Sequence, residues 1–139
     1  FDSNRGAAIA FTARYPLLNL DVRNTIITGY ADDQLMGTPA DAAIPFNYSF
    51  DHCVIRTPKV TTVDSIHFTN VLYEDVKETV SMGQKHFMKI DSNRQYYDFR
   101  LSNKSAAIDK ADPSTAVPTD CSGLPRDSRP DMGAFEYKP

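Results

Sequence analysis

The sequence lacks several features that define common protein classes. It contains no tryptophan, so a hydrophobic core depends on its 8 phenylalanines, its 7 tyrosines and its aliphatic residues. No apolar run reaches the roughly 20 residues that a membrane-spanning helix needs. The net charge is −3, and lysine and arginine form no basic strip. Neither a membrane span nor a nucleic-acid partner is therefore expected.

Cysteine is scarce as well, and the sequence leaves two interpretations of it open. Cys53 and Cys121 are buried free thiols, or they form one disulfide between the tail and the body of the fold. No CxxC pattern is present, and the three histidines lack zinc-like spacing to the cysteines. We expect no metal and no cofactor.

The chain begins at Phe1 and shows no charged or apolar region of a signal peptide. Residues Phe1–Phe11 already look like the middle of a fold, so we expect a fragment of a longer chain. The 139 residues correspond to one structural domain.

Short stretches rich in Leu, Ile, Val, Phe and Tyr, bounded by Gly, Pro, Asn and Asp, predict strands. They are Ala7–Thr12, Leu17–Thr28, Phe46–Arg56, Ser65–Tyr73, Phe87–Ile90 and Asp98–Leu101. A helical alternative exists for Leu72–Met82, where Leu72, Val76 and Val80 are four residues apart. We expect a strand to Tyr73, then a loop or short helical turn that ends at Gly83.

A repeat connects these stretches. Leu17–Thr28 aligns without a gap on the segment Pro45–Arg56 at a shift of 28, with Leu18 over Phe46 and Val22 over Phe50. A shorter copy, Phe68–Tyr73, follows at a shift of 18. Apolar and polar residues alternate in the first half of each copy, as in a half-buried strand. Repeats of this kind predict a solenoid of stacked coils, a parallel β-helix.

The register assigns structural roles to several polar residues. Asn24, His52 and Asn70 fall at corners, because Asn tolerates the left-handed backbone that a corner requires. Arg23 falls over Asp51, which predicts a cross-coil ion pair on the outer surface, worth roughly 0–1 kcal/mol. We expect coils over residues 1–101 and an irregular C-terminal tail over 102–139, where turn-forming dipeptides with Pro, Asp and Gly dominate.

The last forty residues contain a long and specific motif, formed by Asp98–Leu101, Ser105–Asp109, Thr119–Arg126 and Pro130–Tyr137. This motif resembles the end of the choice-of-anchor Q family of bacterial proteins. The resemblance implies a right-handed parallel β-helix and a secreted, periplasmic or cell-surface location. It also implies association with polysaccharide in some members, but it assigns no reaction. In this chain Cys121 and Ser122 stand where the family often has acidic residues.

The residues favour a non-catalytic structural role over an enzyme, and we assign no catalytic residue. The expected partners are the remainder of the β-helix and polysaccharide. Rings near loops or corners, such as Tyr30, Tyr96 and Tyr97, are candidates for stacking on sugars. The predicted substrate-binding residues are Tyr30, Asp32, Asp33 and Arg56.

Two alternatives stay open. A polysaccharide lyase needs an acidic or cation site and a basic side chain, and a glycoside hydrolase needs two carboxylates about 5–10 Å apart. No spacing singles out such a pair among Asp21, Asp51, Glu74 and Asp75, so this alternative places the active site mainly upstream. The second alternative is a surface adhesion module.

Overall fold

The computed structural model describes residues 6–39 and 41–139, and almost all of its regular structure is β-strand. The fold class is all-β, as predicted. The elements are β1 (Ile9–Ala13), β2 (Asp21–Arg23), β3 (Ile26–Ile27), β4 (Leu35–Pro39), β5 (Ser49–Asp51), β6 (Val54–Ile55), the 3-10 helix η1 (Val63–His67), β7 (Phe68–Thr69), β8 (Leu72–Tyr73), the 3-10 helix η2 (Gln84–His86), β9 (Phe87–Asp91) and β10 (Tyr96–Leu101). None of the helices in this part of the chain has the length and apolar character to cross a membrane.

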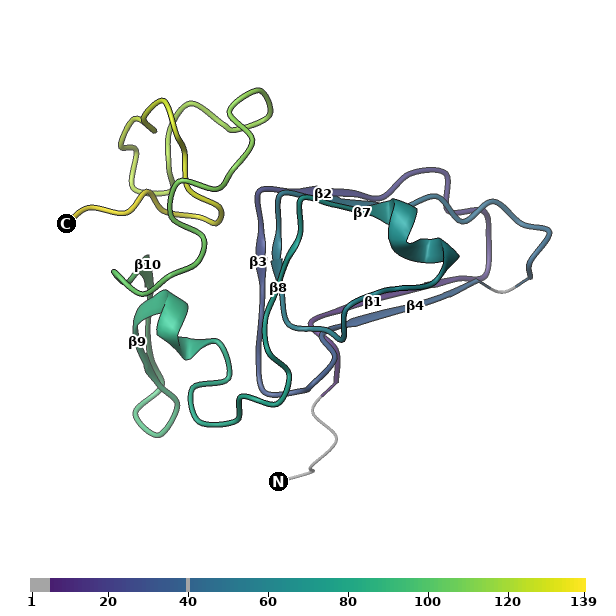
Figure 1. The fold of residues 1–139 in the computed structure, drawn as a ribbon, viewed down its shortest axis with the longest axis horizontal. Helices are drawn as coiled ribbons and strands as arrows, with labels where there is room; N and C mark the ends of the chain where they lie inside the picture. Colours follow the sequence, from purple (N-terminus) through teal and green to yellow (C-terminus); the bar gives the residue numbers. More distant parts are fainter. Residues whose placement is uncertain (1–5, 40) are drawn as a thin grey trace.

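Eight of these strands form three small parallel sheets, which lie along three sides of a triangle in Figure 1. β1 pairs with β4, β2-β5-β7 form the second sheet, and β3-β6-β8 form the third. The chain visits the sides in turn, and we call one passage around them a coil. Each sheet is open and has only two or three strands, with β1, β2 and β3 all at sheet edges.

The repeat predicted from the sequence sets the register of the stacked strands. Val22 pairs with Phe50 and Ile26 with Val54, both at a separation of 28 residues. The separation falls to 18 for the next coil, where Phe50 pairs with Phe68. Both repeat lengths are confirmed.

One position of that alignment is wrong. The sequence places Leu18 over Phe46, whereas in the structure Leu17 pairs with Phe46. The register returns to 28 within the next few residues, so one extra residue is accommodated here. An irregularity of this kind, like a β-bulge, moves a side chain to the opposite face. Leu18 is accordingly exposed to solvent.

The chain turns from the second sheet into the third at three residues with left-handed backbone. Asn24, His52 and Asn70 have φ angles of 50°, 48° and 52°, and each lies between two strands of one coil. Positive φ is uncommon for residues other than glycine, but Asn, Asp and His adopt it several times more often than the rest. This explains why these residue types recur at one place in the repeat.

The interior of the triangle is filled by a stack of rings and aliphatic side chains. Phe50 is fully buried at its centre, and its ring lies parallel to that of Phe68 with centroids 5.3 Å apart. The rings of Phe11 and Tyr48 pack on Phe50 at 6.1 and 6.3 Å. Burial of one such ring contributes roughly 1.5–3 kcal/mol, so the ladder of aromatic residues supplies much of the apolar free energy of this core.

The third sheet packs against other residues on both faces along β3 and β6. Ile27 and Ile55 point into the triangle, while Ile26 and Val54 pack outward against Met132 and other residues of the tail. This two-sided burial explains why the apolar residues continue without alternation after each corner. The tail, residues 102–139, contains no helix or strand and is therefore irregular, as predicted.

Other predictions were less accurate. β4 was not predicted, whereas the corners predicted at Asn24 and His52 divide each of the two long stretches into two strands. The segment after Tyr73 forms turns and no α-helix, so the loop alternative is confirmed. Gly83, with φ of 82°, precedes η2 and does not end a helix.

β9 and β10 pair as an antiparallel hairpin that lies beyond the β3-β8 side of the triangle (Figure 1).

Both cysteines are free thiols, so the disulfide interpretation is wrong, and the expectation of a buried thiol holds for Cys53 but is wrong for Cys121. Cys53 is buried and donates weak hydrogen bonds to the carbonyl oxygens of Val22 and Asp51, and Cys121 is exposed. Burial raises the pKa of Cys53 to about 11.

Thiol labelling of the folded protein is therefore expected to stop at one equivalent. Cys121 reacts at once with an aromatic disulfide reagent at neutral pH, because its thiol is exposed, whereas Cys53 reacts only when the fold opens. The measurement is the absorbance time course with and without urea, with Cys121→Ser as the control. Two fast equivalents in the folded protein would contradict the buried position of Cys53.

Candidate functional site

Arg56, one of the predicted substrate-binding residues, is enclosed by the fold. Its side chain is only 1% exposed. The guanidinium donates hydrogen bonds to the carbonyl oxygens of Ala31, Asp75 and Val76, each at 3.1 Å. It also reaches Asp32 Oδ1 at 3.4 Å. Arg56 thus connects the loop after β3 with the loop after β8, and its donors are used inside the protein.

The other three predicted binding residues lie at the surface on the loop after β3. Asp32 is 75% exposed, and Tyr30 is partly exposed. Asp33 Oδ1 accepts hydrogen bonds from Thr57 Oγ1 at 2.6 Å and from the Leu35 N–H at 3.1 Å. Asp33 therefore fixes the start of β4, and Tyr30 and Asp32 are the residues of this group that present their side chains outward.

The stacking of Arg23 over Asp51 is observed, but the predicted ion pair between them is not. The backbones pair in register, yet Arg23 contacts Asp21 at 3.7 Å within its own strand. Asp51 Oδ1 instead contacts His52 Nδ1 at 2.9 Å and accepts from Asn70 Nδ2 at 3.2 Å. Arg23 thus pairs within its own strand, whereas Asp51 pairs with the adjacent His52 and with Asn70 of the next coil.

The corner also brings together a potential cation-binding group. Ligand atoms of Asp51, His52 and Asp112 lie within 4.8 Å of one another. Asp112 comes from the tail, and both of its carboxylate oxygens accept hydrogen bonds from Ser114 Oγ at 2.8 Å. The hydrogen bond from the Ser114 N–H to Oδ1 at 2.9 Å, together with these hydroxyl bonds, lowers the pKa of Asp112. Asp51 Oδ1, His52 Nδ1 and both carboxylate oxygens of Asp112 thus already have hydrogen-bond partners within the protein.

A second polar cluster lies between the coils, the hairpin and the tail. His86 Nδ1 accepts from the Ala106 N–H at 3.3 Å, which leaves the ring proton on Nε2, 2.9 Å from Glu74 Oε1. Ser105 Oγ lies 3.2 Å from Nδ1. Burial raises the pKa of Glu74, but hydrogen bonds from His86 and Thr28 outweigh it, and the pKa falls below its ordinary value.

This Ser-His-Glu order resembles the arrangement that activates a serine nucleophile, but its setting differs. All three side chains are buried, and Ser105 Oγ accepts a hydrogen bond from the Ala107 N–H at 3.2 Å. An attacking oxygen needs an open approach for the substrate, which the burial of this cluster does not provide. The cluster therefore joins three parts of the fold. Sequence spacing gave no signal of it, because the three residues meet only through tertiary packing.

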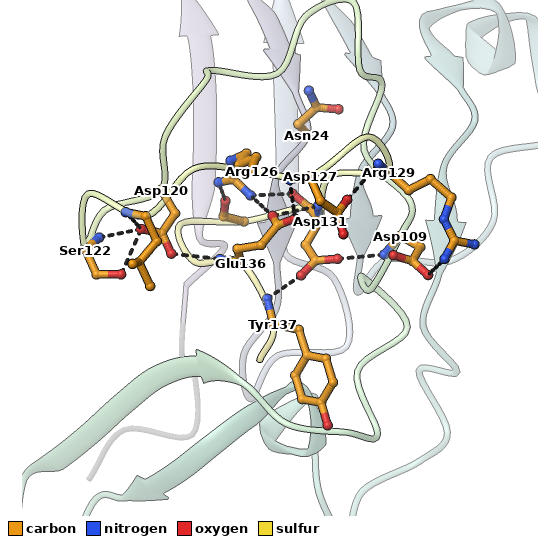
Figure 2. Close-up of polar contacts among 12 residues, drawn as sticks. Asn24, Asp109, Asp120, Ser122, Arg126, Asp127, Arg129, Asp131, Glu136 and Tyr137 are labelled. Atoms are coloured by element: carbon orange, nitrogen blue, oxygen red, sulfur yellow. Dashed lines mark hydrogen bonds and ion pairs between the residues drawn. The ribbon is translucent and has the colours of Figure 1, made fainter. Parts of the chain in front are cut away.

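The tail is held by buried carboxylates, as Figure 2 shows. Asp120 Oδ1 accepts from the backbone N–H groups of Ser122 and Leu124 at 2.8 and 3.0 Å, and Oδ2 accepts from that of Glu136 at 3.0 Å. Burial raises the pKa of Asp120, but these hydrogen bonds hold it well below the ordinary range. Asp131 accepts from the Asp109 and Tyr137 N–H groups, and burial raises its pKa.

Arg126 completes this tail network. It pairs with Glu136 at 2.9 Å and donates to the carbonyl oxygens of Asp131 and Gly133 (Figure 2). Arg129 pairs with Asp109 at 3.2 Å. Charge-assisted hydrogen bonds of this kind stabilise a segment that has no strand or helix of its own.

The tail network is attached to the first corner through Asn24. Asn24 Oδ1 accepts from the Asp112 N–H at 2.7 Å, and its Nδ2 donates to the Asp112 carbonyl and to Thr115 Oγ1 at 3.2 Å each. The Asn24 carbonyl accepts from the Gly133 N–H at 2.7 Å. One corner residue thus fixes both the bend of the coil and the position of the tail.

Two adjoining cavities lie between the outer face of β3 and the hairpin, and they share Thr28, Phe87 and Phe99. The larger, about 450 Å³, extends toward Gly133 of the tail. The smaller, about 200 Å³, is the hairpin groove. Its lining includes Tyr30, Gln84, Ile90, Ser92, Tyr97 and Phe99.

The hairpin groove is the candidate binding site. Of the residues expected to contact a ligand, the structure places Tyr30 and Tyr97 in its wall, while Tyr96, 54% exposed, is absent from the lining. Gln84, Ser92 and Phe99 were not predicted as binding residues. The alternation of Tyr97, Phe99 and Leu101 was the available signal, because it marks one apolar face of a strand.

In comparisons with known proteins, no family model matches the chain, and no curated protein is significantly similar to it.

Proposed function

We propose that this chain is the C-terminal part of a secreted, periplasmic or cell-surface protein with a right-handed parallel β-helix, of the choice-of-anchor Q type. Its role is structural and non-catalytic: it completes the stack of coils and presents a glycan-associated surface. The observation that carries the proposal is the in-register succession of parallel strands with left-handed corners at 24, 52 and 70. The tail motif quoted above supports the family.

Three further features support this architecture. The crossover between parallel strands of one sheet is right-handed in roughly 98% of proteins, which favours a right-handed coil. The edge strands β1, β2 and β3 all lie at the beginning of the stack. Proteins normally pair or cover such edges, so the remainder of a longer β-helix is the expected partner there. The tail covers the outer face of the third sheet.

The non-catalytic role is supported by the state of the polar groups. Arg56, Glu74 and His86 are buried and hydrogen-bonded to the fold, and Asp51 is engaged at the corner. Each of these four groups is therefore engaged by a structural partner. A lyase or hydrolase site located upstream, and a surface adhesion module, are the competing functions.

Substitution of His52 tests whether this corner has a structural or a catalytic role. We expect His52→Asn to leave any polysaccharide turnover by the intact protein unchanged, because asparagine occupies the equivalent corners at 24 and 70 and accepts the same backbone conformation. The measurement is release of unsaturated or reducing ends from uronate-containing and neutral polysaccharides, with the melting temperature of each variant as the control for folding. Asp51→Asn is assayed in parallel. Turnover that disappears in either variant while the melting temperature is retained would contradict the structural role.

A further inference from the structure

We propose that the hairpin groove binds a neutral saccharide, with a sugar ring lying against Tyr97 on one wall and near Tyr30 on the other. The inference rests on the glycan association proposed above, and it adds the site and the class of sugar. The groove lies between the loop after β3 and the hairpin, so its two walls come from the coils and from β10.

The apolar part of the groove is a platform of aromatic rings. Tyr97 and Phe99 project from the same side of β10, and their rings are parallel, with an angle of 7° and centroids 6.0 Å apart. Phe87 packs edge-on against Phe99 at 5.3 Å and fixes its orientation. Tyr97 and Phe99 are still about half exposed. Half-exposed rings held in a fixed orientation offer an aromatic surface to the C–H face of a pyranose ring.

The polar part of the groove has free hydrogen-bonding capacity. The side chains of Gln84 and Ser92 line the groove and make no hydrogen bond with the described residues. The amide of Gln84 offers two donors and one acceptor group, and the hydroxyl of Ser92 offers both functions. Sugar hydroxyl groups also donate and accept hydrogen bonds, so these two side chains can bind the hydroxyl groups around a sugar ring.

The charge of the groove selects the class of sugar. No charged residue is among the described residues that line it. A uronate or sulfate group would need an arginine, a lysine or a cation beside it, because an unpaired charge in a partly desolvated site costs free energy. The volume, about 200 Å³, is below that of typical drug-sized sites, which suits one ring of a longer chain. The groove therefore favours neutral over acidic glycans, with weak affinity per site.

The test is an NMR titration of the protein with cellohexaose as the neutral probe and a galacturonate hexamer as the acidic probe. Tyr97→Ala removes the ring from the groove wall, and Tyr96→Ala is the matched control, since the neighbouring ring is similarly exposed but does not line the groove. We expect cellohexaose to bind the wild type, and Tyr97→Ala to weaken this binding about tenfold. Tyr96→Ala leaves binding unchanged, Tyr97→Phe keeps most of the affinity, and Gln84→Ala weakens it.

The outcomes distinguish the inference from the proposed function. Binding of the galacturonate hexamer with no binding of cellohexaose overturns the neutral class and leaves the glycan association standing. Cellohexaose binding that is lost in Tyr96→Ala but kept in Tyr97→Ala overturns the groove as the site. Absence of binding to either probe overturns both the inference and the glycan association. Melting temperatures confirm that each variant is folded.

Discussion

Replacing Arg56 with alanine is expected to lower the free energy of unfolding by about 3–5 kcal/mol. The substitution removes a buried guanidinium and leaves the carbonyl oxygens of Ala31, Asp75 and Val76 without their donor. Each buried acceptor that loses its partner costs about 1–3 kcal/mol, less whatever water recovers. Urea unfolding followed by circular dichroism measures the change.

The matched control for this prediction is Arg100→Ala. Arg100 pairs with Asp98 on the surface of the hairpin, and its side chain is largely exposed. An exposed pair is worth about 0–1 kcal/mol, so this variant remains close to the wild type. If Arg56→Ala were no more destabilising than Arg100→Ala, the guanidinium of Arg56 would be free in solution, and its predicted role in substrate binding would regain support.

Replacing Phe50 with alanine is the second large expected effect, a loss of about 3–5 kcal/mol. Phe50 is fully buried and contacts rings from the coil on either side of it, so its removal leaves a cavity that neighbouring strands cannot close without losing register. The measurement is again urea unfolding, with the slope of the transition compared between variants to verify two-state behaviour.

Tyr15→Ala serves as the control for Phe50→Ala. Tyr15 is 77% exposed, and substitution of such a residue changes stability by about 0.5 kcal/mol or less. A Phe50→Ala variant with a similarly small loss would show that the rings do not form a continuous interior stack. The stacking of coils would then lack its main source of apolar free energy.

The repeat and its corners could be predicted from the sequence because they depend on local chemistry. The shift of 28 superimposes apolar residues that must share one interior row, and the residues at 24, 52 and 70 are of the types that accept positive φ. The Arg23–Asp51 ion pair was a wrong prediction for a related reason. Register fixes where backbones lie, but a long exposed side chain pairs with whichever opposite charge is nearest.

β4 could not be predicted because its sequence contains Gly37 and Pro39, which ordinarily disfavour strands. The structure explains the glycine. A Cβ atom at position 37 would lie 2.6 Å from the ring of Phe11 in the paired strand, so only glycine allows this close approach. The pairing of β4 with β1 therefore depends on a contact between residues 26 apart.

The candidate binding site was only partly predictable. Tyr30 and Tyr97 were candidates by residue type, but the groove exists only because the hairpin docks beside β3, a tertiary contact with no sequence signature. Arg56 was misleading for a similar reason. An arginine that follows an apolar strand ordinarily reaches solvent, and only the two loops that converge on it make it a buried connector.

Directed disulfide formation tests the in-register stacking of coils most directly. Asp21 and Ser49 are paired residues on neighbouring strands with side chains on the outer surface, whereas Asp21 and Asp51 are offset by two residues. Neighbouring strands lie about 4.8 Å apart, and an offset of two residues lengthens the Cα separation to about 8 Å. A disulfide spans about 4.4–6.8 Å. In a Cys121→Ser background, we expect the Asp21→Cys/Ser49→Cys pair to oxidise rapidly to a disulfide and the Asp21→Cys/Asp51→Cys pair to form none. Preferential formation of the disulfide in the offset pair would contradict the 28-residue register.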